Sequence, residues 1–138
     1  MLKILIAEDE ELIRKGIVLT VDWASLGCIV TAEAANGAEA LEMMDQHKPD
    51  LIITDLKMPV MDGIEMLEVL RKRGDQTPVI ILTAYDSFDY ARSALRLGAV
   101  DYLLKPFHDG DLENAVQYAK QKLVQPSPSI MLPGIKKD

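Results

Sequence analysis

Residues 50–55 read Asp-Leu-Ile-Ile-Thr-Asp, a short apolar run that ends at a carboxylate, Asp55. Similar apolar runs occupy residues 2–7, 78–82 and 100–104. Short apolar runs bounded by turn residues are typical of buried strands. A further strand is expected near residues 28–34. We therefore predict five strands, and the residues that follow four of them are Glu8-Asp9, Asp55, Thr83 and Lys105.

Segments with apolar residues at helical spacing separate these strands. Helices are expected over about 10–20, from 36 to before 49, from 62 to 74, over about 87–97 and over about 109–123. Asn36 is a good N-cap, and Glu39 three residues later suggests a capping box. Strands joined through helices of this length form right-handed crossovers and a parallel sheet covered on both faces. We predict a flavodoxin-like (βα)5 fold, a doubly wound α/β domain with strand order 2-1-3-4-5.

The composition is typical of one soluble globular domain, with 138 residues of which 49% are hydrophobic and 27% charged. No apolar stretch approaches the roughly 20 residues of a membrane span. The first strand begins almost at Met1, which leaves no room for a signal peptide. Cys28 is the single cysteine, so no internal disulfide is expected and the cytoplasm is favoured. The net charge of −7 argues against nucleic-acid binding by this segment itself.

The last residues differ in character from the rest. Residues 125–129 read Gln-Pro-Ser-Pro-Ser, a linker composition, and residues 130–138 show no helix or strand pattern. We assign residues 1–124 to the folded domain and residues 125–138 to a linker or disordered tail. The chain is expected to be truncated inside a linker before a further C-terminal domain, with a plain disordered tail as the alternative.

The predicted strand order places several acidic side chains at one edge of the sheet. Strands one and three are neighbours, so Glu8, Asp9 and Asp55 converge where open α/β sheets bind ligands. Carboxylates packed together repel unless a cation joins them, and hard oxygen ligands suit Mg²⁺. We predict Asp9 and Asp55 as direct ligands and Glu8 as a ligand directly or through water. The backbone carbonyl of Lys57 could supply a further oxygen.

The same edge suits a phosphoryl group. A carboxylate can act as a nucleophile that forms an acyl phosphate, and Asp55 is the predicted phosphoacceptor. Lys105 can neutralise one phosphoryl oxygen, while the Thr83 hydroxyl and the backbone N–H of Ala84 can bond another. An acid or a lysine at a strand end is by itself an ordinary turn or surface residue. Their occurrence at the ends of four strands favours an active site.

These segments resemble the receiver domains of bacterial two-component response regulators. The matching stretches are residues 6–10, 55–63, 82–84 and 98–107, and the resemblance covers residues 1 to about 124. It implies an acidic pair in Glu8 and Asp9, a phosphoacceptor in Asp55 and an invariant lysine in Lys105. In the family the first acidic residue is more often Asp than Glu. The resemblance further implies a sensor histidine kinase as phosphodonor.

The resemblance also implies a switch. Phosphate would draw the Thr83 hydroxyl toward it, and Tyr102 would rotate into the space that this frees. The face formed by the fourth helix, fifth strand and fifth helix would then change shape. Homodimerisation on phosphorylation through this face occurs in the family and stays open here. The Lys105–Pro106 bond resembles one that is cis in the family.

Residues 22–27 and 85–91 resemble regulators that carry an AraC-type DNA-binding domain (YesN-like). Control of transcription is therefore expected, with DNA contacted only through a C-terminal domain that this chain lacks, and no membrane is involved. A stand-alone receiver that acts by protein contact or phosphorelay is an alternative, and the length of the gene beyond Asp138 would separate the two.

Two other classes share parts of this pattern. A Mg²⁺-dependent phosphatase with an aspartyl nucleophile would carry a second Asp two residues after Asp55, where this chain has Lys57. We therefore expect no enzymatic turnover beyond slow self-dephosphorylation. A flavin binder of the same topology would need a phosphate-binding loop after the first strand, where residues 8–11 are all acidic.

Overall fold

Five parallel strands form one sheet in the order β2-β1-β3-β4-β5. The computed structural model describes residues 1–106, 108 and 110–124. The strands are β1 (Leu2–Ala7), β2 (Cys28–Ala34), β3 (Leu51–Asp55), β4 (Val79–Thr83) and β5 (Asp101–Leu104). The helices are α1 (Glu11–Thr20), α2 (Gly37–His47), α3 (Gly63–Lys72), α4 (Phe88–Arg96) and α5 (Asp111–Val124). The predicted fold and strand order are confirmed, while Phe107, Asp109 and the predicted tail 125–138 lie outside the described residues.

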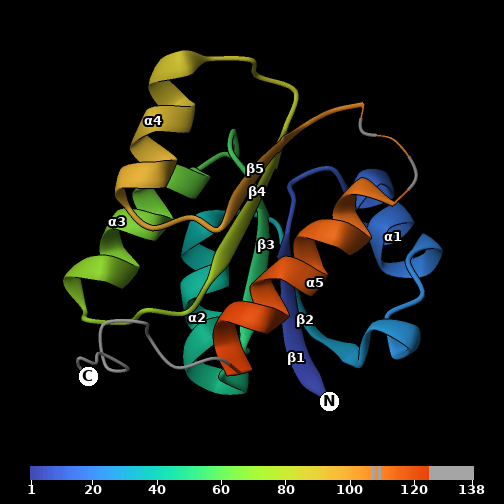
Figure 1. Cartoon of the computed structure of the whole chain (residues 1–138). Coiled ribbons are helices and arrows are strands. Elements are labelled where there is room, and N and C mark those ends of the chain that lie inside the picture. Colours follow the sequence, from blue (N-terminus) through green and yellow to red (C-terminus); the bar gives the residue numbers. More distant parts are fainter. Residues whose placement is uncertain (107, 109, 125–138) are drawn as a thin grey trace, which may run out of the picture.

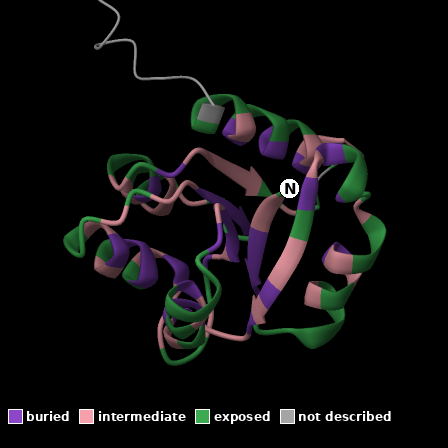
Figure 2. Cartoon of the chain, turned by 90° about the horizontal axis from the view of Figure 1, so that it is seen from below, coloured by how far each residue is buried: buried purple, intermediate pink, exposed green. Residues whose placement is uncertain are grey.

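Helices cover both faces of the sheet (Figure 1). Helices α2, α3 and α4 pack on one face, and α1 and α5 pack on the other. Successive strand residues alternate between these two apolar clusters, so that Leu5 and Ile52 belong to one and Ile4 and Ile53 to the other. Figure 2 shows the buried residues along the central strands and the exposed ones on the outer faces of the helices. Because both faces are covered, the open edges at the strand ends are where polar chemistry can meet solvent.

The helix starts follow the capping signals with one difference. The Asn36 side chain accepts from the Glu39 N–H at 2.9 Å, and Asp62 forms a complete capping box with Glu65. At α2 the Glu39 carboxylate instead accepts from the N–H of Ala35, one residue before the cap. The predicted capping box at Asn36 is therefore displaced by one residue, because the extended cap presents the preceding N–H to Glu39.

A short 3-10 helix, Ala24–Leu26, lies between α1 and β2 and was not predicted. It ends at Gly27, whose φ of 73° is in the left-handed region that glycine adopts without strain. The Trp23 side chain before it is buried and donates its indole N–H to the Val18 carbonyl at 3.1 Å. Trp23 is therefore a packing residue at the end of α1.

The start of α3 packs directly on the end of β3. The Gly63 N–H donates to the Leu56 carbonyl at 2.8 Å, and a Cβ atom on Gly63 would overlap the carbonyl oxygen of Asp55. Glycine is thus required here by the close approach of two backbones. The packing of α3 against this strand end fixes the backbone that presents Asp55. None of the helices in the described ranges is long and apolar enough to cross a membrane.

Candidate functional site

Three carboxylates converge at the carboxyl edge of the sheet. Glu8 and Asp9 follow β1, and Asp55 ends the neighbouring strand β3. One carboxylate oxygen from each lies within 4.8 Å of the others. Glu8 is only 2% exposed, whereas Asp9 is exposed. The convergence predicted from the strand order is therefore present.

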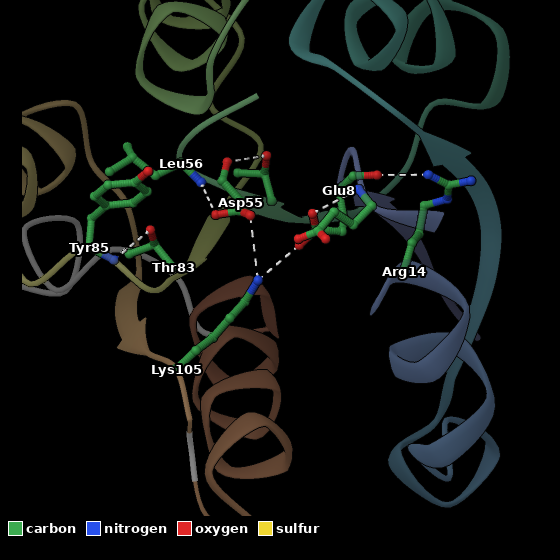
Figure 3. Close-up of polar contacts among 9 residues, drawn as sticks. Glu8, Arg14, Asp55, Leu56, Thr83, Tyr85 and Lys105 are labelled. Atoms are coloured by element: carbon green, nitrogen blue, oxygen red, sulfur yellow. Dashed lines mark hydrogen bonds and ion pairs between the residues drawn. The ribbon is translucent and has the colours of Figure 1, made fainter. Parts of the chain in front are cut away.

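Lys105 reaches this cluster from the segment after β5 (Figure 3). Its Nζ lies 2.9 Å from Glu8 Oε1 and 3.4 Å from Asp55 Oδ2. Burial alone would lower the pKa of Lys105, but the hydrogen bond to Glu8 and the charges of Asp55 and Glu8 outweigh burial and raise it. Lys105 is therefore a fixed positive charge at neutral pH. The peptide bond between Lys105 and Pro106 is cis, as the resemblance implied.

The acidic side chains differ in how their oxygens are engaged. Asp55 Oδ1 accepts from the N–H of Leu56 at 2.6 Å, and Glu8 Oε2 accepts from the N–H of Glu10 at 3.1 Å. The pKa of Asp9 is raised by partial burial, and by the hydrogen bond to Glu8 and its negative charge. One ammonium thus faces three carboxylates, which leaves the cluster with excess negative charge. Hard oxygen donors in this arrangement fit a small divalent cation such as Mg²⁺.

Thr83 ends β4 and lies on the side of Asp55 away from Glu8 (Figure 3). The residue is fully buried, and its hydroxyl accepts from the N–H of Tyr85 at 3.1 Å. The Tyr102 hydroxyl, from β5, donates to the carbonyl of the same Tyr85 at 2.8 Å. Ala84, between Thr83 and Tyr85 in the sequence, is exposed on the loop after β4. The two residues predicted as a switch are thus both bonded to the backbone of Tyr85.

Lys57 follows Asp55 on the β3–α3 loop, and its side chain points to α4. The Nζ donates to the Tyr90 hydroxyl at 2.5 Å and lies 4.6 Å from the centre of the Tyr90 ring. It also lies 5.5 Å from the centre of the Tyr85 ring. The sequence predicts the Lys57 carbonyl as a metal ligand, and this contact stays a prediction. The side chain ties the loop beside Asp55 to the first turn of α4.

The match to known families agrees with this geometry. The model of the response regulator receiver domain matches residues 4–117 of the chain. The chain belongs to this family. It is a receiver domain of a response regulator in a two-component system, as the motifs at the strand ends predicted.

Relatives of this receiver domain include a regulator of RpoS and a transcriptional regulatory protein. Over 107 residues it is 46% identical to the Regulator of RpoS from Escherichia coli strain K12, a match that covers 78% of this chain and 31% of that protein. Over 117 residues it is 36% identical to the uncharacterized transcriptional regulatory protein YesN of Bacillus subtilis strain 168, covering 85% of this chain and 32% of YesN. The predicted likeness to YesN is confirmed. The chain spans about half the length, or less, of such curated relatives.

Solved receiver domains have the same architecture. The REC domain of AraT, a response regulator from Geobacillus stearothermophilus, superimposes with a TM-score of 0.80 at 43% sequence identity. That match covers 88% of this chain and 95% of the AraT domain. The parallel sheet and its helices are therefore those of a receiver domain.

Two side chains that contact this site were not singled out from the sequence. Arg14 on α1 donates to the Glu8 carbonyl at 2.7 Å, and Tyr90 on α4 binds Lys57. Arg14 follows Glu10 by four residues, which is ordinary for an exposed pair on a helix. Tyr90 lies in the segment 85–91, which the sequence distinguishes only by its resemblance to regulators with an AraC-type domain. Neither position carries a local signal, because each contact depends on how separate elements pack.

Proposed function

We propose that this receiver domain takes a phosphoryl group from a sensor histidine kinase onto Asp55 and so switches a surface that a partner reads. The observation that carries the proposal is the placement of the Lys105 ammonium between Glu8 and Asp55. Phosphoryl transfer needs positioning and charge neutralisation more than a base. A strand-end carboxylate beside a fixed ammonium provides both.

The contacts of Asp55 suggest which oxygen reacts. Oδ1 accepts a short bond from the Leu56 N–H, whereas Oδ2 has Lys105 at 3.4 Å. Oδ2 is the less constrained oxygen, and we assign it as the nucleophile. It bonds to phosphorus as the bond between phosphorus and the imidazole nitrogen of the kinase breaks. Lys105 then pairs with one phosphoryl oxygen, while the Thr83 hydroxyl and the Ala84 N–H donate to others.

The acidic cluster supports Mg²⁺ as the cofactor. Asp9, Asp55 and the carbonyl of Lys57 would hold it directly, and Glu8 directly or through water. A bound Mg²⁺ supplies positive charge to the phosphoryl oxygens during transfer. Because Glu8 already contacts Lys105 at 2.9 Å, it also holds the lysine close to the phosphoacceptor. That second task suits the extra methylene of Glu over Asp.

The switch would run through the backbone of Tyr85. Its N–H donates to the Thr83 hydroxyl and its carbonyl accepts from Tyr102. When the Thr83 hydroxyl turns to donate to a phosphoryl oxygen, its geometry as an acceptor from Tyr85 changes. The loop then moves, and Tyr102 moves with it. This changes the face formed by α4, β5 and α5, where a partner or a second copy of the phosphorylated domain would bind.

The output of the switch is proposed to be control of transcription. Relatives such as YesN are named as transcriptional regulators and are longer than this chain. Residues 125–138 would be the linker to a C-terminal DNA-binding domain. DNA would be contacted through that domain alone, since the receiver domain carries a net negative charge.

Intact mass spectrometry after incubation with acetyl phosphate and MgCl₂ tests the chemistry. The wild type should gain one phosphoryl group, and neither Asp55→Asn nor wild type in EDTA should do so. Asp50→Asn is a matched control, because Asp50 lies before β3 and its carboxylate accepts from the Lys3 N–H at 2.8 Å, at the other end of the strand. If Asp55→Asn gains the group as readily as the wild type, Asp55 is not the phosphoacceptor.

A further inference from the structure

Arg14 connects three elements around the acidic cluster. It lies on α1, and its side chain is only 14% exposed. Its Nη1 donates to the Glu8 carbonyl at 2.7 Å, as Figure 3 shows, and its Nε donates to the Glu33 carboxylate at 3.0 Å. The neighbouring Lys15 also pairs with Glu33, at 2.9 Å, but is far more exposed. Arg14 therefore joins the end of β1 to α1 and to β2.

These contacts complete the fixation of Glu8. Its N–H donates to the Ala34 carbonyl at 2.9 Å, at the end of β2. Its carbonyl accepts from Arg14, and its carboxylate binds Lys105 and the N–H of Glu10. Each polar group of this buried residue is thus bonded. Loss of Arg14 would leave the carbonyl without this donor and would release the peptide group between Glu8 and Asp9.

Apart from the bond between the Glu10 N–H and the Glu8 carboxylate, the start of α1 lacks the usual side-chain support. The N-cap residue of α1 is Glu10, and in the described structure its side chain makes no capping hydrogen bond. A side-chain cap normally accepts from a backbone N–H of the first turn and so stabilises the start of a helix. Here the bond from Arg14, one turn into the helix, links α1 back to the end of β1. The direction of the Asp9 side chain depends on that same stretch of backbone.

We infer that Arg14, held by Glu33, is a positioning residue for the Mg²⁺ pocket: it fixes the Glu8 carbonyl and thereby the orientation of the Glu8 and Asp9 carboxylates. This inference rests on the proposed function. Partners that orient metal ligands commonly change metal affinity by about 10- to 100-fold when they are removed. Arg14 touches backbone rather than a ligand atom, so we expect a loss near the lower limit, about tenfold.

The sign of the effect separates positioning from simple electrostatics. A positive charge near the pocket opposes cation binding, so its removal should tighten Mg²⁺ binding if charge alone matters. If Arg14 orients the ligands, its removal should weaken Mg²⁺ binding. Arg14→Lys leaves the net charge unchanged, yet a single ammonium lacks the planar fork that serves Glu8 and Glu33 together. Lys15→Met removes an equal charge from the same helix and from the same Glu33, without touching Glu8.

The test is a titration of each ¹⁵N-labelled protein with MgCl₂, following the amide resonances of the acidic loop by NMR. We expect dissociation constants about tenfold higher than wild type for Arg14→Lys and Arg14→Met. For Lys15→Met we expect an unchanged or lower constant. Urea unfolding in EDTA checks that each variant is folded. If Arg14→Met does not fold, the comparison of Arg14→Lys with the wild type provides the test.

Two results would overturn the inference in different ways. In the first, the wild type is phosphorylated on Asp55, but the Arg14 variants bind Mg²⁺ as tightly as Lys15→Met does. The proposed function would then stand, and Arg14 would have no positioning role. A wild type without saturable Mg²⁺ binding would overturn the Mg²⁺-dependent function and the inference together.

Discussion

Replacement of Lys105 by Met should destabilise the domain when no divalent cation is present. The Lys105 ammonium contacts Glu8 at 2.9 Å and Asp55 at 3.4 Å. Glu8 is 2% exposed, and Lys105 is the one cation that contacts its carboxylate among the described residues. Methionine keeps most of the side-chain volume but not the charge. The variant therefore isolates the electrostatic role of Lys105.

The size of the loss follows from burial. Removal of one partner from a fully buried pair costs about 3–5 kcal/mol, because the other charge stays buried without compensation. The side chains of Lys105 and Asp55 are 20% and 14% exposed, so water reaches the pocket from one side. We therefore expect the free energy of unfolding to fall by about 2–3 kcal/mol at neutral pH.

Urea unfolding followed by the fluorescence of the buried Trp23 measures this loss in EDTA. Lys72→Met, at an exposed position at the end of α3, is the control and should change stability by less than about 0.5 kcal/mol. Added MgCl₂ should stabilise Lys105→Met more than the wild type, because Mg²⁺ then does not share the carboxylates with an ammonium. A loss below about 0.5 kcal/mol, or equal stabilisation of both proteins by MgCl₂, would refute this reasoning.

Four further predictions concern residues around the site, on α1 and in the core. Gly63→Ala should lower the free energy of unfolding by about 1–3 kcal/mol in urea and slow phosphorylation by acetyl phosphate, because the new Cβ would overlap the Asp55 carbonyl. Gly16→Ala has nothing near its new Cβ and should instead stabilise the protein by about 0.5–1 kcal/mol. Burial would raise the pKa of Glu33, but the hydrogen bonds from Lys15 and Arg14 outweigh it and lower the pKa. The stability that Glu33 provides is then present above its unfolded-state pKa and is lost as the pH falls through its folded-state pKa, so Glu33→Gln should flatten the acidic limb of a stability profile measured against pH. Burial also raises the pKa of the Cys28 thiol, so a thiol reagent such as dithionitrobenzoate should react slowly with the native protein and rapidly in urea; a fast native reaction would place Cys28 nearer the surface than the structure has it.

The fold could be predicted from the sequence because its signals are local. Each strand is a short apolar run, each crossover is a helix, and parallel connections admit few strand orders. The convergence of Glu8, Asp55 and Lys105 then follows from topology, because the carboxyl ends of parallel strands share one edge.

Contacts between separate elements could not be predicted in this way. Lys57 and Tyr90 are 33 residues apart, and their contact depends on the approach of α4 to the β3–α3 loop. The sequence predicts Glu8 as a metal ligand, and the structure shows that its carboxylate is bonded to Lys105. A strand-end position fixes where a side chain starts. Which neighbour its terminal atoms reach depends on packing, and a single methylene can decide it.

The described interior contains three buried polar side chains, those of Glu8, Thr54 and Thr83, and each lies at the carboxyl end of a central strand. Thr54 donates to the Asp55 carbonyl at 2.9 Å, and the other two have the partners given above. A buried polar group that loses its partner destabilises the fold by about 1–3 kcal/mol. These three side chains are therefore tolerated in the apolar interior only while each of them keeps its hydrogen bonds. If phosphorylation draws the Thr83 hydroxyl away, we expect Tyr85 to move, because its N–H donates to that hydroxyl and its carbonyl accepts from Tyr102.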